Sequence, residues 1–367
     1  DVSREALIEG FRPDTILRAI PLRDASGSVR PADDVATALA EAVEQGIADG
    51  RRVMLHALDL SKTGLLAPGL PVLRDLRARY GDRIDLVVDA CQTRLSPERV
   101  RAYLALGAMV QITGSKFFTG PPFAGAVLLP PAVAARLGGG RLPSGLDAYF
   151  GRGELPEDAR AARGLRNSAN YGLALRWRAA LAEAAAFGAV PEERTVRILE
   201  RFAETVASSI ARHGIFALQD IPALDRQGGG WDARRSIFAF AVRSPFQPRF
   251  MTLNEARKLY QWLNADCSEC FDDAAARALA SRICHIGQPV ALPDGNGGMT
   301  GLLRVSAGAR LISGEPSHRG LRSARRLDRE MADLAMVFDK IALLCAVWER
   351  VAAANPVPRY WARNPAG

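Results

Sequence analysis

Residues 84–92 read Ile-Asp-Leu-Val-Val-Asp-Ala-Cys-Gln, a short and mostly apolar run that ends in an acid and an amide. A run of this kind between segments of helical spacing is typical of a strand in a parallel sheet that helices cover on both faces. The first half of the chain repeats this alternation, which predicts an α/β sheet with right-handed crossovers. We expect strands at residues 52–58, 84–88, 108–112 and 123–129, and helices at residues 35–47, 70–80 and 97–106.

The second half of the chain has a different composition. A Gly-, Pro- and charge-rich stretch at residues 138–163 indicates a loop region. Thr252 and Glu255 have the spacing of a capping box, so a helix should begin there. The remaining segments predict a smaller α+β domain, with helices at 171–187, 191–213 and 328–354 and strands at 236–242 and 302–306. We therefore divide the chain into a large domain at 1–165, connecting helices at 166–213 and a small C-terminal domain at 214–367.

Composition excludes several classes of protein. The chain has 367 residues, 48% of them hydrophobic, and no apolar run of about 18 residues, so neither a disordered protein nor a membrane-spanning protein is expected. The net charge of +8 comes from arginines interleaved with acids along helical segments, which indicates solvated helix faces rather than a nucleic-acid surface. Five cysteines in a long chain without a secretion signal favour the reducing cytoplasm.

Two clusters of polar residues follow predicted strands. Asp89 and Gln92 close the run quoted above, and Thr113, Ser115 and Lys116 follow the next strand. In an open parallel sheet, ligands bind at the carboxyl ends of the strands, so we expect these side chains in one crevice. The chain holds only four lysines, and Lys116 lies before a Gly- and Pro-rich turn. Both observations favour a functional amine over a merely solvated one.

The order of these residues resembles a known family. An Asp-x-x-Gln motif, a small-residue stretch ending in Lys, and then Gly-Pro and a further Gly form the signature of the class V aminotransferase and cysteine desulfurase branch of fold-type I pyridoxal 5'-phosphate (PLP) enzymes. The segment Ser61-Lys-Thr-Gly64 falls where that family has an Asn-x-x-Gly turn. The resemblance runs from about Arg18 to Leu129 and weakly on to Ser306. It implies a three-layer α/β sandwich, PLP as cofactor and an amino acid as substrate.

The resemblance also implies a role for each residue near the cofactor ring. Lys116 would form the Schiff base with the cofactor aldehyde. Asp89 would keep the pyridine nitrogen protonated, because a neighbouring negative charge favours the charged form. The protonated ring would then accept electrons from the substrate. Gln92 would contact the ring hydroxyl, with Ser61 near it.

Phosphate and substrate contacts are implied at further positions. Thr113 and Ser115 would donate hydrogen bonds to the phosphate, and the family often has a histidine at the second of these positions. Ser168, in an Asn-Ser pair where the family has Gly-Thr, would reach the phosphate of a neighbouring subunit and so implies a homodimer. Arg304, in the last predicted strand, would take the substrate carboxylate through its planar guanidinium, with Arg310 as the fallback.

Three functions remain open at this stage: a PLP-dependent aminotransferase, a C–S lyase or cysteine desulfurase, and a non-catalytic homologue. A desulfurase needs a nucleophilic cysteine, but Cys284 lies two residues before the aligned position, Ile286, and a buried inert thiol is the commoner role. Lys116 paired with Asp89 argues against a non-catalytic homologue. The lone Cys-x-x-Cys motif at residues 267–270 does not predict a metal site, and no membrane partner is expected.

The resemblance starts late in the family's pattern. The family's lysine lies near the middle of its chains, whereas here it is residue 116. The family's phosphate-binding loop and the aromatic residue that stacks on the cofactor ring find no convincing match in residues 1–30. We therefore expect the N-terminal part of the large domain to be absent from this sequence. The identity of the substrate stays open.

Overall fold

The structure, a computed structural model, describes residues 9–226, 228–314 and 324–357. The chain forms two compact units, and each is described by itself. Unit 1 consists of Asp1–Pro21, Pro31–Asp59 and Ala67–Ala185. Unit 2 consists of Leu22–Arg30, Leu60–Leu66 and Ala186–Gly367.

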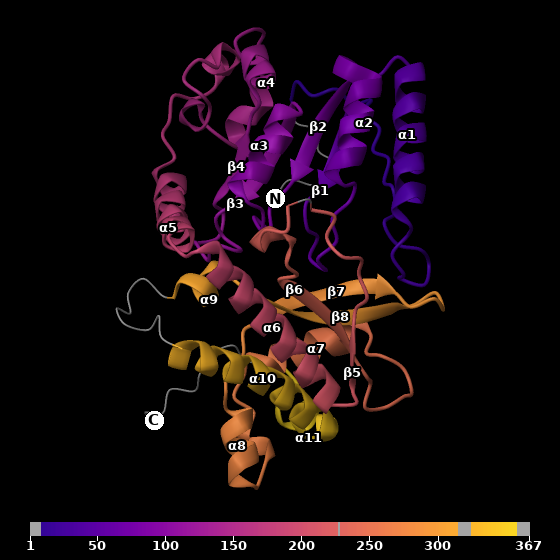
Figure 1. The fold of residues 1–367 in the computed structure, drawn as a ribbon, viewed down its shortest axis with the longest axis vertical. Helices are drawn as coiled ribbons and strands as arrows, with labels where there is room; N and C mark the ends of the chain where they lie inside the picture. The colour runs from indigo at the N-terminus through magenta and orange to yellow at the C-terminus, as the bar shows by residue number, and fades with distance from the viewer. Residues whose placement is uncertain (1–8, 227, 315–323, 358–367) are drawn as a thin grey trace. The chain divides into compact units, whose positions relative to one another are not determined.

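Unit 1 is built on a four-stranded sheet with the order β1-β2-β3-β4 (Figure 1). The strands are β1 (Val53–Leu58), β2 (Ile84–Asp89), β3 (Ala108–Thr113) and β4 (Gly125–Leu128). The helices of this unit are α1 (Ala32–Ala48), α2 (Leu70–Tyr80), α3 (Pro97–Ala105), α4 (Pro131–Arg136) and most of α5 (Tyr171–Gly188). The α/β class predicted from the sequence is confirmed.

The alternation of helices and strands has clear local causes. Leu86, Val87 and Val88 of β2 are all buried, as expected for a strand covered on both faces. Helix α3 begins where the sequence predicts, because the Ser96 hydroxyl accepts the N–H of Arg99 and caps the first turn. Each fully buried Leu or Val side chain in this core contributes about 1.5–3 kcal/mol relative to an exposed one.

Strand β4 departs from the expectation of an all-parallel sheet. It pairs with β3 in the antiparallel sense, with Thr113 opposite Gly125. A parallel crossover needs a dozen or more residues and usually a helix. The segment 114–124 is shorter than that and contains no helix, so the chain turns back on itself and the next strand runs in the opposite direction.

Unit 2 has the α+β character predicted for the second half of the chain. Its sheet has the order β5-β6-β8-β7, and every neighbouring pair is antiparallel. The strands are β5 (Phe216–Leu218), β6 (Ile237–Val242), β7 (Gly287–Pro293) and β8 (Met299–Ser306). The helices are α6 (Glu192–Arg212), α7 (Leu253–Leu263), α8 (Ala274–Ala280), α9 (Ala309–Ser313), α10 (Ala324–Ala346) and α11 (Trp348–Ala354).

Helix ends in unit 2 confirm one prediction and correct another. The capping box is present: Thr252 Oγ1 accepts the N–H of Glu255 at 3.3 Å, and the Glu255 carboxylate accepts the N–H of Thr252 at 2.7 Å. The closing helix expected at 328–354 is two helices, because Val347 leaves helical geometry with φ −126° and ψ 36°. In the described part of the chain, no helix is long and apolar enough to cross a bilayer.

Candidate functional site

The carboxyl edge of the parallel strands in unit 1 carries the candidate site. Asp89 is the last residue of β2, and Thr113 is the last residue of β3. Because neighbouring parallel strands end at the same edge, the segments that follow them leave the sheet together. Asp59, directly after β1, ties this edge together, since its backbone N–H donates to the carbonyl of Asp89 at 2.9 Å.

One threonine joins the two polar clusters predicted from the sequence. Thr93 is buried, and its hydroxyl donates to the carbonyl of Thr113 at 2.8 Å. The same oxygen accepts the N–H of Thr113 at 3.2 Å. A φ of 51° at Thr93 helps to close the turn that follows β2. The turn at 89–93 is therefore fixed to the start of the segment that carries Lys116.

The thiol of Cys91 is affected by both charged residues of the site, Asp89 and Lys116. Its N–H donates to Asp89 Oδ1 at 3.0 Å. Burial and the Asp89 carboxylate raise the pKa of the Cys91 thiol to about 11, while the positive charge of Lys116 acts in the opposite direction. Asp89 and Lys116 therefore both lie close enough to Cys91 to affect its thiol.

Gln92 and Lys116 have hydrogen-bonding capacity to spare. The Gln92 side chain is 7% exposed, yet its amide makes no hydrogen bond to any residue that the structure describes. The amide atoms themselves reach solvent, so they can bond to water or to a polar ligand. The exposed Lys116 amine likewise has no hydrogen bond or ion pair with a described residue. Both groups are available to a ligand.

The hydroxyls of Thr113 and Ser115 are bonded to each other. Thr113 Oγ1 donates to the carbonyl of Ala124 at 2.9 Å and lies 2.8 Å from the Ser115 hydroxyl oxygen. Since Thr113 has one hydroxyl hydrogen and uses it on a carbonyl, Ser115 is the donor of the pair. A phosphate would therefore have to compete with bonds that already exist. The donor role of both residues stays a prediction.

Helix α5 packs against the lysine segment. A Cβ on Gly114 would overlap the Cβ of Ala180, and one on Gly120 would lie 2.8 Å from it. Trp177 of the same helix donates its indole N–H to the carbonyl of Gly125 at 3.1 Å. The glycines around Lys116 thus have a packing reason that the sequence motif alone does not reveal. Their role is to let the helix approach the backbone closely.

Three neighbours of the site were missed in the sequence. Asp59 is 1% exposed and accepts the hydroxyl of Tyr103 at 3.0 Å, which ties the end of β1 to helix α3. Cys91 lies inside the Asp-x-x-Gln motif and Thr93 directly follows it, but neither was given a role. A signal existed for Asp59, because it is an acid at the end of an apolar strand, as Asp89 is. The hydrogen bonds of Thr93 depend on the turn and leave no pattern in the sequence.

Ser61 and Ser168 have local roles in the structure. Ser61 belongs to unit 2, where its hydroxyl accepts the N–H groups of Thr63 at 3.1 Å and Leu65 at 3.0 Å and so closes a turn. Ser168 is exposed in the loop before α5, and its carbonyl accepts the N–H of Gly153 at 3.3 Å. The predicted contacts of both serines with a cofactor stay predictions.

Arg304 lies on β8 in unit 2, opposite a glycine. Its Nε donates to the carbonyl of Gln288 at 3.2 Å. A Cβ on Gly287 would lie 2.5 Å from the Arg304 Cγ, so the missing side chain makes room for the guanidinium. Burial lowers the pKa of Arg304, although arginine stays charged throughout the physiological range. Arg310, the fallback, is exposed on α9.

The described residues contain no group of three or more His, Cys, Asp or Glu side chains that could hold a metal ion.

No known protein family matches the sequence, and no curated protein matches it. Solved structures do resemble it in part. The 4-hydroxyphenylacetaldehyde synthase of Rhodiola rosea is 12% identical, with a TM-score of 0.47, over 91% of this chain and 57% of that chain.

Two further solved structures show a similar degree of likeness. Oryza sativa TDC with PLP and tryptamine is 14% identical, with a TM-score of 0.45, over 91% of this chain and 56% of that chain. The apo cysteine desulfurase of Thermococcus onnurineus is 12% identical, with a TM-score of 0.43, over 86% of this chain and 64% of that chain. The chain thus spans less than two thirds of the length of each of these proteins. Likeness at this level assigns no activity, and the function is argued from the site.

Proposed function

We propose that this chain carries the cofactor site of a PLP-dependent enzyme that acts on an amino acid, with Lys116 as the lysine that binds the cofactor. One observation carries the proposal. Asp89 ends β2, Thr113 ends β3 three residues before Lys116, and two hydrogen bonds between Thr93 and Thr113 hold the segments after these strands together at the carboxyl edge of a parallel sheet. The sequence motif that contains these residues resembles that of fold-type I PLP enzymes.

The residues present fit the cofactor. The unbonded amide of Gln92 would donate to an oxygen on the ring, and the Asp89 carboxylate would stabilise a protonated ring nitrogen. When bound, PLP withdraws electrons from the α-carbon of an amino acid. Lys116 holds a proton on its amine and can move it to or from a substrate carbon, which is general acid–base catalysis. Ser115 would have to turn away from Thr113 to donate to the phosphate.

Among PLP-dependent enzymes that act on amino acids, we propose that this one is an aminotransferase. Its test is a product analysis of the full-length protein with single amino acids, in the presence and absence of a 2-oxo acid. Transfer of the amino group to the oxo acid supports the proposal. Release of CO2 or of sulfide without amino-group exchange would replace it with a decarboxylase or a C–S lyase. The homodimer and the cytoplasmic location belong to the same proposal.

Cys284 separates the aminotransferase from the desulfurase. The Cys284 thiol is 4% exposed, and burial raises its pKa, which opposes the thiolate that a desulfurase needs. We expect Cys284→Ser to leave turnover within about threefold, a barrier change below roughly 1 kcal/mol. The measurement is kcat with an amino acid and a 2-oxo acid, together with sulfide release from cysteine. Sulfide that forms in the wild type and disappears in the variant would establish the desulfurase instead.

Arg304 is proposed to bind the substrate carboxylate. A charge-assisted hydrogen bond contributes about 1.5–3 kcal/mol, so Arg304→Ala should raise KM for an amino acid by about 10- to 100-fold. The KM of the corresponding amine, which lacks the carboxylate, should change little. Gly287→Ala is a second variant, because the new Cβ would push the same guanidinium out of place. Equal changes in KM for acid and amine would leave Arg304 a structural residue.

A further inference from the structure

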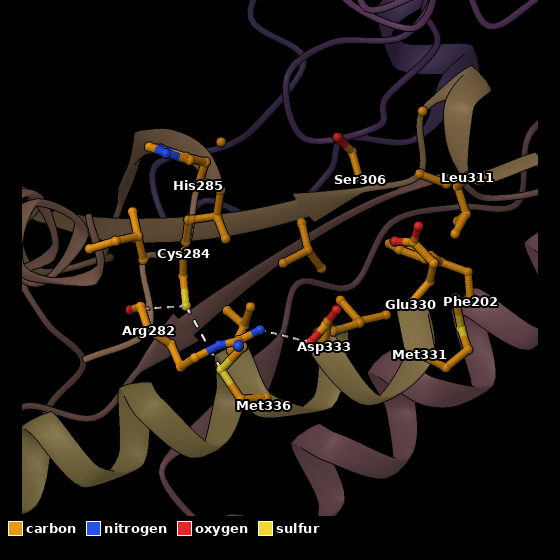
Figure 2. Close-up of a pocket in the computed structure, with 18 residues that line it drawn as sticks. Phe202, Arg282, Cys284, His285, Ser306, Leu311, Glu330, Met331, Asp333 and Met336 are labelled. Carbon is orange, nitrogen blue, oxygen red and sulfur yellow. Dashed lines mark hydrogen bonds and ion pairs between the residues drawn. The ribbon is translucent and has the colours of Figure 1, made fainter. Parts of the chain in front are cut away.

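Unit 2 contains a cavity of about 490 Å³ (Figure 2). Its walls come from α6, from the segment 282–287 before and at the start of β7, from the end of β8 with α9, and from α10. All of its lining residues lie in one unit of the chain. The volume is within the range of small-molecule sites, about 300–1,000 Å³.

Apolar side chains form part of the cavity lining. Its lining includes the side chains of Phe202, Val305, Leu311, Met331, Leu334 and Val337. Sulfur atoms add to this surface, because Cys284 Sγ points toward Met336 Sδ at 3.9 Å (Figure 2). Burial keeps that thiol in its neutral form by raising its pKa. This part of the lining suits an aliphatic or thioether side chain.

Charged groups of both signs line the same cavity. Arg282 Nη2 lies 3.2 Å from Asp333 Oδ1, and both side chains are more than half exposed, at 57% and 56%. Glu330, 46% exposed, adds a second carboxylate, which Arg326 contacts at 3.3 Å. Exposed ion pairs of this kind contribute about 0–1 kcal/mol, so the Arg282–Asp333 pair opens at little cost.

We infer that this cavity binds a free amino acid with a bulky apolar side chain. The ligand carboxylate pairs with Arg282, the ammonium group pairs with Asp333 and Glu330, and the side chain packs on the apolar part of the lining. The opened ion pair is exchanged for two others, because each partner takes the opposite end of the zwitterion. The guanidinium and the carboxylates recognise both ends of an amino acid, whereas an amine or a carboxylic acid satisfies only one.

This site is separate from the one around Lys116 and does not rest on the proposed function. It shares no residue with that site, and no residue assigned there lines the cavity. A second amino-acid site in a protein proposed to act on amino acids would report the concentration of a substrate or product.

The first test is calorimetric titration of the full-length protein with L-leucine and its relatives. We expect L-leucine to bind, and L-leucinamide, 4-methylpentanoate and glycine each to bind at least about tenfold more weakly, because each lacks one of the three groups recognised. No heat with L-leucine up to about 10 mM, or equal binding of leucinamide, would overturn the inference. These ligands require no variant that could fail to fold.

The second test uses variants of the charged pair. Arg282→Met and Asp333→Asn should each weaken L-leucine binding at least about tenfold. Arg350→Met is the control, because Arg350 is about as exposed as Arg282, at 52% against 57%, and forms an ion pair with Asp272 at 3.0 Å outside the cavity lining. Unchanged binding in the Asp333 and Arg282 variants would contradict the inference, as would an equal loss in the control.

Lys116→Ala distinguishes this inference from the proposed function. Binding of L-leucine in that variant should stay within about twofold of the wild type, since an effect below about 0.4 kcal/mol is expected for a residue outside the cavity. If Lys116→Ala alone abolishes binding, the ligand occupies the other site and the cavity inference is wrong. If the protein proves to have no PLP chemistry, L-leucine binding to the cavity is still measured and still decides the inference.

Discussion

Lys116→Ala should reduce turnover by about 100- to 10,000-fold, because proton transfer by a positioned side chain contributes a factor of that size. The variant should also lose the covalent attachment of cofactor to protein, since Lys116 is the residue assigned to the Schiff base. The measurements are kcat for an amino acid and the visible absorbance of the protein before and after denaturation. In the variant, we expect the cofactor absorbance to separate from the protein on denaturation. In the wild type, after chemical reduction, we expect the absorbance to stay with the denatured protein.

A lysine elsewhere provides the control for this variant. Lys258 lies in unit 2 on α7, with Nζ 5.2 Å from the centre of the Trp262 ring. Lys258→Ala removes a positive charge and a cation–π contact, and we expect it to leave kcat within about twofold. Near-normal turnover in Lys116→Ala, or a comparable loss in Lys258→Ala, would contradict the role assigned to Lys116.

Asp89→Asn should lower kcat by about 10- to 1,000-fold while some cofactor binding remains. A neighbouring opposite charge shifts a pKa by about 1–3 units, and each unit changes the protonated fraction of the ring nitrogen up to tenfold. The asparagine keeps the size of the side chain, and its amide oxygen can still accept the N–H of Cys91. The loss should therefore appear in kcat, measured against amino acid concentration, rather than in the folded state, followed by thermal unfolding.

Asp85 on the same strand is the matched control for Asp89. Hydrogen bonds from Arg52 lower the pKa of Asp85 to about 2, with a second contribution from Arg136. Because the pKa of Asp85 is lower in the folded protein than in the unfolded chain, its carboxylate stabilises the fold at pH values above the unfolded pKa. That contribution is lost as the pH falls toward 2. Asp85→Asn should thus reduce the Tm at neutral pH and leave kcat nearly unchanged. An equal loss of kcat in both variants would show that Asp89 acts on the sheet and not on the chemistry.

The sequence predicted the elements of unit 1 well because each one has a strong local signal. Apolar runs such as that of β2, and the N-cap Ser96, depend on neighbouring residues only. The direction of β4 was wrong, since it depends on the length of the connection before it rather than on its own residues. Strands β5 and β7 were missed because one has three residues and the other contains Pro289 and Pro293.

In the candidate site, too, features set by the strands could be predicted, and features set by the turns could not. The nearness of Asp89 to Lys116 could be predicted, because parallel strands place their ends at one edge. Three features depend on the turns, which the sequence does not specify: the bonds of Thr93, the Gln92 amide without a described partner, and the hydrogen bond between Thr113 and Ser115. The cavity of unit 2 was not expected, since its walls come from segments up to 135 residues apart, from Phe202 to Val337.

The most direct test of the central claim is reduction of the full-length protein with borohydride, followed by peptide mapping with mass spectrometry. Borohydride fixes a Schiff base between a lysine and PLP as a stable adduct, so the mass shift identifies the lysine. The account predicts that the shift appears on the peptide that contains Lys116 and disappears in Lys116→Ala. An adduct on Lys62, Lys258 or Lys340 instead, or none after the protein has been supplied with PLP, would contradict it.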